Sequence, residues 1–352
     1  MRRRLKKTGM GFLASLAGSR REPLDENPES FLIIRRNRMG DMLCTVPLLH
    51  ALRREFPRAR ISVACEAEGE PIARACLAVN DVYVLKRGLK LYANLRNARQ
   101  LQGFDAVLAV KVGFDLRIAS LTRMTQAPIR VGFERLAPKN PSFYYTHIVP
   151  PPLTPEHQIE SCLRLLRPFG IHKPAIDLTL DLPDSAMDFA VSELQSRHYH
   201  DHAFFAMLNI SSTQPLKWPL KNFKALAQRL VEQENGLVAV VSAPADRERA
   251  RHLVKEIGSP SVFAPETPSV LELAALLRYA AFVFTPEGGV GHLAASFDRP
   301  AIIFWSGGPY NKWNTRATHH HNIRADLAKK PISVDDVWEI VADNFLPDRQ
   351  AS

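Results

Sequence analysis

Short apolar runs and amphipathic stretches alternate along most of the chain. Residues 31–34, 106–110 and 281–284 are apolar throughout, as are strands that a parallel sheet buries on both faces. The stretch from about 42 to 56 instead places apolar side chains on one face at helical spacing. Because strand-like and helix-like segments alternate in this way, we predict an α/β fold of doubly wound parallel sheets.

The pattern predicts strands in both halves of the chain. In the first half they are 31–34, 60–64, 82–85, 106–110 and 129–133, followed by a loop over 140–154 and a helix over 156–169. In the second half they are 203–209, 236–242, a short one near 262, 281–284 and 300–304. Three consecutive histidines at 319–321 are expected in a late, solvent-facing loop.

The length of the chain predicts two domains, since it has 352 residues and single cores rarely grow beyond roughly 250–300 residues. We place Rossmann-like domains at 31–175 and 176–332. A basic tail and linker, 1–30, precedes them, and a helix and tail, 333–352, follow. Two such domains would face each other across a cleft, with ligands at the carboxyl ends of the strands.

The net charge of +10 indicates an anionic partner: nucleic acid, a membrane surface or a phosphorylated substrate. No stacking motif or helix-turn-helix pattern accompanies the charge, which disfavours nucleic acid. The four cysteines show no CxxC spacing, so we expect reduced thiols in a cytosolic protein.

The first residues are strongly basic, with five Arg or Lys among residues 1–7, and a dilute apolar stretch follows at 9–18. No apolar run in the chain approaches the ~20 residues that span a bilayer. We therefore expect a tail that touches an anionic membrane surface. A disordered tail without a partner remains the alternative.

Polar chemistry gathers in the turn after the strand at 281–284. Glu287, Gly288 and Gly289 interrupt the apolar pattern, and helix formers resume around His292. Glycines permit tight turns and close backbone approach, and the free N–H groups of a following helix can hold a phosphate. An ordinary turn between strand and helix is the alternative.

A second polar loop follows the strand at 203–209. It carries the hydroxyls of Ser211 and Ser212, then Lys217 and Trp218. Asp246 follows the next strand, where a carboxylate can accept hydrogen bonds from ribose hydroxyls. The competing interpretation is a surface lysine beside a packed tryptophan.

In the first half, Asp41 follows Gly40 in the loop expected after the first strand. Its carboxylate can project toward a ligand and act as a general base. The alternative is an aspartate that caps the following helix.

Three of these segments together resemble glycosyltransferase family 9, the ADP-heptose:lipopolysaccharide heptosyltransferases. They are 32–53, with its Gly-Asp turn, 211–219, with Lys-Trp-Pro, and 285–300, with its glycines and histidine. The resemblance implies a GT-B fold, with two Rossmann-like domains and the donor held mainly by the second. It also implies inverting sugar transfer from a nucleotide sugar, with ADP-heptose expected, and no cofactor or obligate metal.

The resemblance also implies roles for individual residues. Asp41 would be the general base, and Lys217 would stabilise the leaving diphosphate. The residues expected at the donor are Ser211, Ser212, Trp218, Asp246, Glu287, Gly288, Gly289 and His292. An anionic lipopolysaccharide-core acceptor would meet the cations Arg35, Arg38, Lys111 and Arg135, which suit carboxylates and phosphates. The enzyme would then work in the cytoplasm, at the inner face of the inner membrane.

Three departures from the family pattern leave the sugar and the acceptor open. Glu287-Gly288-Gly289 stands where the family has Asp-Thr-Gly, 306–313 replaces a Gly-Pro-Thr loop, and 109–113 replaces Asp-x-Gln-Gly. The alternatives are a family-9-like transferase with another nucleotide sugar or acceptor, a nucleotide-sugar 2-epimerase, and a non-catalytic member that binds glycolipid.

Overall fold

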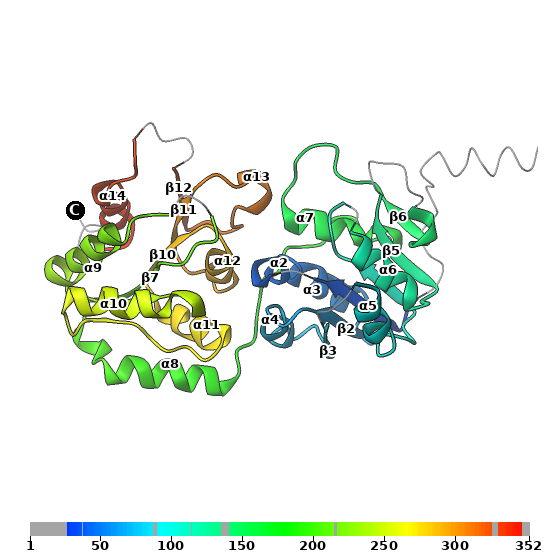
Figure 1. The fold of residues 1–352 in the computed structure, drawn as a ribbon, viewed down its shortest axis with the longest axis horizontal. Coiled ribbons are helices and arrows are strands. Elements are labelled where there is room, and N and C mark those ends of the chain that lie inside the picture. Colours follow the sequence, from blue (N-terminus) through cyan, green and yellow to red (C-terminus); the bar gives the residue numbers. More distant parts are fainter. Residues whose placement is uncertain are drawn as a thin grey trace, which may run out of the picture. The chain divides into compact units, whose positions relative to one another are not determined.

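The chain divides into two compact units, residues 1–177 and 178–352. The computed structural model describes residues 27–36, 38–86, 90–113, 115–134, 141–214, 217–325 and 330–346. Residues 1–26, which include the predicted basic tail, and Arg135 lie outside these residues. Figure 1 shows that each unit contains a sheet with helices packed around it.

The first unit has a six-stranded sheet of order β3-β2-β1-β4-β5-β6, with every neighbouring pair parallel. Its strands are β1 (Ser30–Arg35), β2 (Arg60–Cys65), β3 (Asp81–Val84), β4 (Ala106–Ala109), β5 (Ile129–Phe133) and β6 (His147–Val149). Its helices are α2 (Met39–Leu43), α3 (Val46–Glu55), α4 (Glu70–Arg74), α5 (Lys90–Ala98), α6 (Leu116–Met124), α7 (Gln158–Leu163) and the 3-10 helices η1 (Pro141–Phe143) and η2 (Arg164–Phe169). The predicted parallel α/β architecture is confirmed.

Three local expectations in this unit were wrong. The loop at 140–154 contains β6, which is too short for an apolar pattern and pairs with β5. The helix expected over 42–56 is split into α2 and α3, because Pro47 has no N–H to continue the hydrogen bonding. The helix expected over 156–169 likewise gives way to a 3-10 helix that contains Pro168.

The second unit repeats the architecture with the order β12-β11-β10-β7-β8-β9, again all parallel. Its strands are β7 (Phe204–Asn209), β8 (Gly236–Val241), β9 (Val262–Phe263), β10 (Phe282–Pro286), β11 (Ala301–Trp305) and β12 (His320–Arg324). Its helices are α8 (Asp184–Ser196), α9 (Leu220–Glu234), α10 (Arg247–Ile257), α11 (Val270–Tyr279), α12 (Gly289–Ser296), α13 (Tyr310–Trp313), α14 (Val334–Asn344) and the 3-10 helices η3 (Tyr199–Asp201) and η4 (Pro244–Asp246). The final helix, α14, packs Val337, Trp338 and Val341 into the core of this unit.

The strand orders locate the expected ligand positions. In each sheet the chain moves outward from one central strand and then returns to that strand's other side, so β1–β4 and β7–β10 are the switch points. Ligands of doubly wound sheets lie outside the carboxyl ends of the strands at such points. Ligand-binding residues are therefore expected directly after β1, β4, β7 and β10.

The three histidines at 319–321 correct another expectation, because His320 and His321 belong to β12 rather than to a loop. The His320 ring lies between the Thr315 hydroxyl, 2.5 Å from Nδ1, and the Arg299 carbonyl, 3.0 Å from Nε2. Since a carbonyl only accepts, Nε2 donates to it and Nδ1 accepts from Thr315. Burial lowers the pKa of His320 from 6.5 to about 4.

This lowered pKa predicts a stability that depends on pH. The folded protein resists protonating His320 more than the unfolded chain does, so this contribution is complete above pH 6.5 and is lost as the pH falls toward 4. We expect the free energy of unfolding, measured by urea titration, to fall by on the order of 2–3 kcal/mol through this group over that interval. His320→Gln should flatten this pH dependence of the unfolding free energy, whereas His321→Gln should leave the pH dependence unchanged. An equally steep loss in His320→Gln would contradict the assignment.

All four cysteines are buried and without disulfides. Burial raises the pKa of Cys76 to about 11 and that of Cys65 to about 12. None of the helices that the structure describes combines the length and apolar character needed to cross a bilayer.

Candidate active site

Asp41 lies at the switch point of the first unit, but in a helix rather than in a loop. It is the third residue of α2, and Arg38 occupies the N-cap position. The expected loop position and the alternative of a capping aspartate are therefore both wrong. The Asp41 side chain is 17% exposed, so its carboxylate is held by the protein yet reachable by a small group.

Arg35 fixes this carboxylate in place. From the last position of β1, its Nη2 lies 2.5 Å from Oδ1 of Asp41, and its Nε donates to the Asp41 carbonyl at 3.2 Å. Its Nη1 donates to the carbonyl of Val110, just after β4, at 2.6 Å. Arg35 is 2% exposed. It thus ties β1, α2 and β4 together, which corrects its expected place against the acceptor: it positions Asp41.

The other expected acceptor residues differ in exposure. Arg38 is exposed at the start of α2, and Lys111 is partly buried directly after β4. Acceptor binding by Arg38 and Lys111 remains a prediction. The same holds for Arg135, which lies outside the described residues.

Asn209 joins the two strands at the switch point of the second unit. It ends β7, is 6% exposed, and donates from Nδ2 to the hydroxyl of Thr285 in β10 at 2.9 Å. Its Oδ1 accepts from the backbone N–H of Ser211 at 3.1 Å. This asparagine links the end of β7 to β10 and fixes the start of the loop at Ser211, and the sequence analysis did not single it out.

Ser211 and Asp246 are brought together as a pair. The Ser211 hydroxyl donates to Oδ2 of Asp246 at 2.7 Å and accepts from the N–H of Ala243 at 2.8 Å. Arg249 donates to Oδ1 of Asp246 at 2.6 Å. Burial acts to raise the pKa of Asp246, but these hydrogen bonds and the charges of Arg249 and Lys217 outweigh it and lower the pKa. Asp246 is therefore held as a carboxylate close to Lys217.

The Ser212 hydroxyl makes a local contact, in which it accepts from the N–H of Gln214 at 3.0 Å. Lys217 is exposed, and the next residue, Trp218, is 4% exposed. The indole packs on Phe223 and Phe284 with ring centroids 4.9 and 4.7 Å apart, and its N–H donates to a backbone carbonyl at 3.0 Å. Trp218 is thus a core residue that anchors Lys217, which corrects its expected place on the nucleotide.

Two of the departures from the family pattern contact each other. Glu287 is 8% exposed, and its Oε1 accepts from the N–H and the hydroxyl of Ser306 at 3.2 and 3.1 Å. A Cβ on Gly308 would lie 2.6 Å from Oε2 of Glu287. The longer carboxylate therefore occupies space that the glycine at 308 leaves open.

This close approach predicts that Gly308→Ala displaces the Glu287 carboxylate from Ser306. Because the obstructed atom ends a flexible side chain, folding stability should change little. If Glu287 lies at the donor, as the family resemblance implies, the loss of two hydrogen bonds to this charged group should lower the affinity for the expected donor, ADP-heptose, by about tenfold in calorimetry. Ser306→Ala removes one of these two hydrogen bonds without a clash, so its donor affinity should fall less. Unchanged affinity in Gly308→Ala would exclude Glu287 from the donor site.

The turn after β10 has the geometry that its glycines predicted. Gly288 has φ +146, a conformation that favours glycine, and Gly289 begins α12. His292 lies one turn into this helix and is 6% exposed. Among the residues that the structure describes, no group of His, Cys, Asp and Glu side chains could hold a metal ion.

Known proteins resemble this chain in sequence. The family model of glycosyltransferase family 9 (heptosyltransferase) matches residues 93–334. Lipopolysaccharide heptosyltransferase 3 of Escherichia coli K12 is 24% identical over 344 residues, 88% of this chain and 96% of that protein.

Solved structures share the fold at low sequence identity. A family 9 glycosyl transferase from Veillonella parvula gives a TM-score of 0.80 at 17% identity, covering 92% of this chain and 99% of that one. E. coli heptosyltransferase WaaC with ADP gives 0.72 at 21% identity, covering 90% and 99%. WaaC with ADP-2-deoxy-2-fluoro heptose gives 0.70. The predicted GT-B fold is confirmed, and since the family model spans most of the chain, this protein belongs to glycosyltransferase family 9, the heptosyltransferases.

Proposed function

We propose that this enzyme moves a heptose from ADP-heptose to a hydroxyl of a lipopolysaccharide core or related glycolipid. The hydroxyl oxygen forms a bond to the anomeric carbon while the bond from that carbon to the phosphate oxygen breaks. ADP leaves, and the Asp41 carboxylate takes the hydroxyl proton. A single displacement opposite the leaving group inverts the anomeric configuration.

The observation that carries the proposal is the held carboxylate of Asp41. Arg35, itself almost fully buried, uses its three nitrogens to fix Asp41 and β4 at the switch point of the sheet. A general base needs a defined position and a path to its substrate, and 17% exposure leaves that path.

The second unit supplies the groups that suit the donor. ADP gains negative charge as the bond breaks, so fixed cations and N–H donors aimed at it would stabilise the transition state. Lys217 on its Trp218 anchor is the cation, and the N–H groups at the start of α12 add donors. Asp246 suits the ribose hydroxyls, with Ser211 and Ser212 beside the phosphates. The ADP and ADP-sugar complexes of WaaC support ADP as the nucleotide.

The coupled pair of Glu287 and Ser306 favours a second candidate, transfer of a different sugar. If Glu287 faces the sugar, its carboxylate is longer than the family's Asp and is held by Ser306. It would then accept hydrogen bonds from other sugar hydroxyls than the Asp does. The donor panel described below separates the two.

Features of the first unit support a membrane-surface location. Large apolar side chains are exposed at several places in this unit: Leu77, Leu95, Leu116, Phe143, Leu153 and Ile176. Arg96, Arg99 and Arg123 of the same unit are exposed as well, and Arg123 lies over the Phe143 ring at 5.7 Å. Exposed apolar side chains can enter the lipid interface, and arginines in the same unit can bind anionic headgroups.

We therefore expect the protein to bind vesicles of anionic phospholipid in a flotation assay. The bound fraction should fall as the salt concentration rises, because salt screens the charges of the arginines. Vesicles of neutral phospholipid are the control. Equal binding to both, or none to either, would contradict the surface assignment.

The reaction is tested by product analysis. The purified protein is incubated with deacylated or intact core acceptor and with ADP-heptose, ADP-glucose or UDP-glucose, and the acceptor is weighed by mass spectrometry. The proposal predicts one added heptose, from ADP-heptose only, with inverted anomeric configuration by NMR. Transfer of glucose instead would favour the second candidate, and retained configuration would contradict the mechanism.

A further inference from the structure

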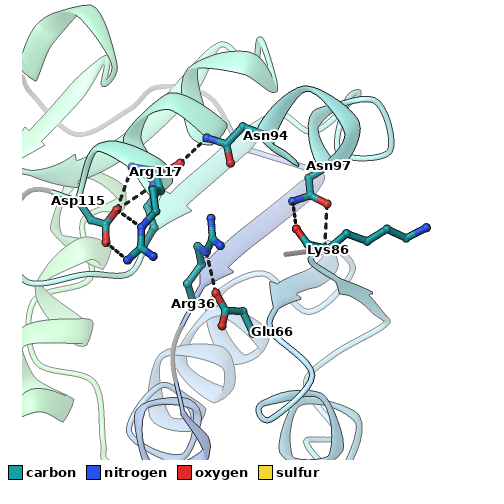
Figure 2. Close-up of polar contacts among 8 residues, drawn as sticks. Arg36, Glu66, Lys86, Asn94, Asn97, Asp115 and Arg117 are labelled. Carbon is teal, nitrogen blue, oxygen red and sulfur yellow. Dashed lines mark hydrogen bonds and ion pairs between the residues drawn. The ribbon is translucent and has the colours of Figure 1, made fainter. Parts of the chain in front are cut away.

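Two neighbouring helices of the first unit, α5 and α6, leave apolar side chains in solvent. Leu95 of α5 is 49% exposed, and Leu116 of α6 is 57% exposed. The two helices pack against each other, and the buried Asn94 donates from Nδ2 to the carbonyl of Arg117 at 3.0 Å (Figure 2). This bond joins the residues directly beside the two leucines, so it keeps both exposed side chains in the same region of the surface.

Arginines accompany the leucines on both helices. Arg99 lies one helical turn after Leu95, and its N–H donates to the Leu95 carbonyl at 3.4 Å. Arg123 lies two turns after Leu116, which places it on the same face of α6. Both arginines are exposed, and Arg123 lies over the ring of Phe143, which is 62% exposed, at 5.7 Å. Cationic and apolar groups are therefore interspersed over one surface.

The sequence around these helices is strongly cationic. Residues 86–133 carry nine Lys or Arg and two Asp, a net charge of +7 in a chain of net +10. Both aspartates have partners: Asp105 accepts from the N–H and the hydroxyl of Ser30 at 2.9 Å, and Asp115 pairs with Arg117 at 2.9 Å. The charge favours an anionic partner, and the exposed leucines favour one with an apolar layer behind its charges.

Two other exposed leucines of this unit lie in acidic stretches of the chain. Leu77 is 72% exposed, and residues 66–81 around it carry four acidic residues and one Arg. Leu153 is fully exposed, and residues 150–160 carry two Glu and neither Lys nor Arg. An anionic surface would repel both stretches, so they serve as matched controls for α5 and α6.

We propose that the exposed face of α5 and α6 is a docking surface for an anionic phospholipid membrane. This α5–α6 face consists of Leu95, Arg96, Arg99, Leu116, Arg123 and Phe143. Its apolar side chains enter the lipid interface, and its guanidinium groups bind the lipid phosphates. The α5–α6 face thus specifies which part of the first unit makes the membrane contact proposed above, and it rests on that proposed location.

The position of α6 gives this docking a use in the reaction. The carbonyl of Val110, directly after β4, accepts from Arg35, which holds Asp41. Leu116 follows Val110 by six residues, which span at most about 20 Å even when extended. Docking through α6 would therefore bring the lipid surface close to the proposed base, where a glycolipid acceptor has to arrive.

The first test is flotation of paired variants with vesicles of phosphatidylglycerol and phosphatidylethanolamine. The apolar pair is Leu95→Ser with Leu116→Ser, and its control is Leu77→Ser with Leu153→Ser. The cationic pair is Arg99→Gln with Arg123→Gln, and its control is Arg58→Gln with Arg197→Gln, both exposed. Residues 1–26 are the same in every variant, so any contribution of the basic tail is common to all.

Each cation at an anionic membrane contributes about fivefold to binding, so the cationic pair should weaken vesicle affinity by on the order of 30-fold. The apolar pair should weaken it by about tenfold, because two half-exposed leucines no longer enter the lipid. Both controls should bind as wild type does, and all variants should melt as wild type does. Wild-type affinity in either pair, or an equal loss in its control, would overturn the docking surface. Dimerisation of wild type that the apolar pair abolishes, with vesicle binding unchanged, would make the face a contact between copies instead.

A fluorophore that is sensitive to its environment tests the position directly. All four native cysteines are buried, so Leu116→Cys and Leu77→Cys can each be labelled selectively. Anionic vesicles should shift the emission of the label at position 116 to the blue and leave the label at position 77 unchanged. No shift at position 116, or equal shifts at both, would overturn the assignment.

Transfer assays separate docking from the proposed reaction. With a soluble, deacylated acceptor, the apolar and cationic pairs should keep the wild-type kcat, whereas transfer to acceptor embedded in anionic vesicles should fall with the bound fraction. An equal loss with both acceptors would contradict a docking role. A wild type that docks but transfers heptose to neither acceptor would sink the proposed function and leave the docking surface standing.

Discussion

Asp41→Asn is expected to lower kcat for heptose transfer by about 10²–10⁴-fold, the usual contribution of a general base. The amide has the same shape and keeps an oxygen for Arg35, but it cannot take the proton of the acceptor hydroxyl. The affinity for ADP-heptose should remain, because the groups proposed to bind the donor lie in the other unit. Steady-state kinetics and calorimetry on one preparation measure both.

The matched control is Asp81→Asn, which also neutralises a carboxylate paired with an arginine in the first unit. Asp81 lies 2.7 Å from Arg60, and this pair is exposed. Surface pairs of this kind contribute about 0–1 kcal/mol, so kcat should be unchanged. Full activity in Asp41→Asn would remove Asp41 from the mechanism, and lost donor binding would make its role structural.

Lys217→Met is expected to lower kcat by about 10²–10³-fold, comparable to the loss of one fixed donor in an oxyanion site. The substitution keeps a long, flexible side chain on the Trp218 anchor and removes only the charge that would face the leaving diphosphate. ADP should also bind more weakly, because the product carries the same phosphates. Single-turnover kinetics separates the chemical step from ADP release.

Lys221→Met is the control, since Lys221 is an exposed lysine of the first turn of α9, close to Lys217 in the chain. It should retain the wild-type rate. If both variants lose activity equally, the effect is one of net charge, and the specific role of Lys217 is refuted.

The sequence was sufficient for the architecture because apolar runs and turn residues are local signals. The strands at 31–34, 106–110 and 281–284 fall within β1, β4 and β10 or extend them by a residue. Short edge strands such as β6 carry too few residues for a period, and β12 has a run of histidines in place of apolar residues.

Individual side-chain roles were harder to predict because they depend on contacts between distant residues. An arginine at the end of a strand looks the same whether it faces a ligand or, like Arg35, binds Asp41 and Val110. Trp218 beside a lysine gives no sign that its indole reaches Phe284. Asn209 had a weak signal, an amide that ends an apolar strand, but its partner Thr285 is 76 residues away.

Acceptor-dependent heptose transfer is tested most directly by counting ADP released and heptose transferred in the same reaction. We expect one ADP for each heptose on the acceptor, negligible ADP without acceptor, and a strong and equal reduction of both products in Asp41→Asn. ADP release that proceeds without acceptor, as hydrolysis or epimerisation would give, or donor and acceptor binding with no release at all, would contradict it.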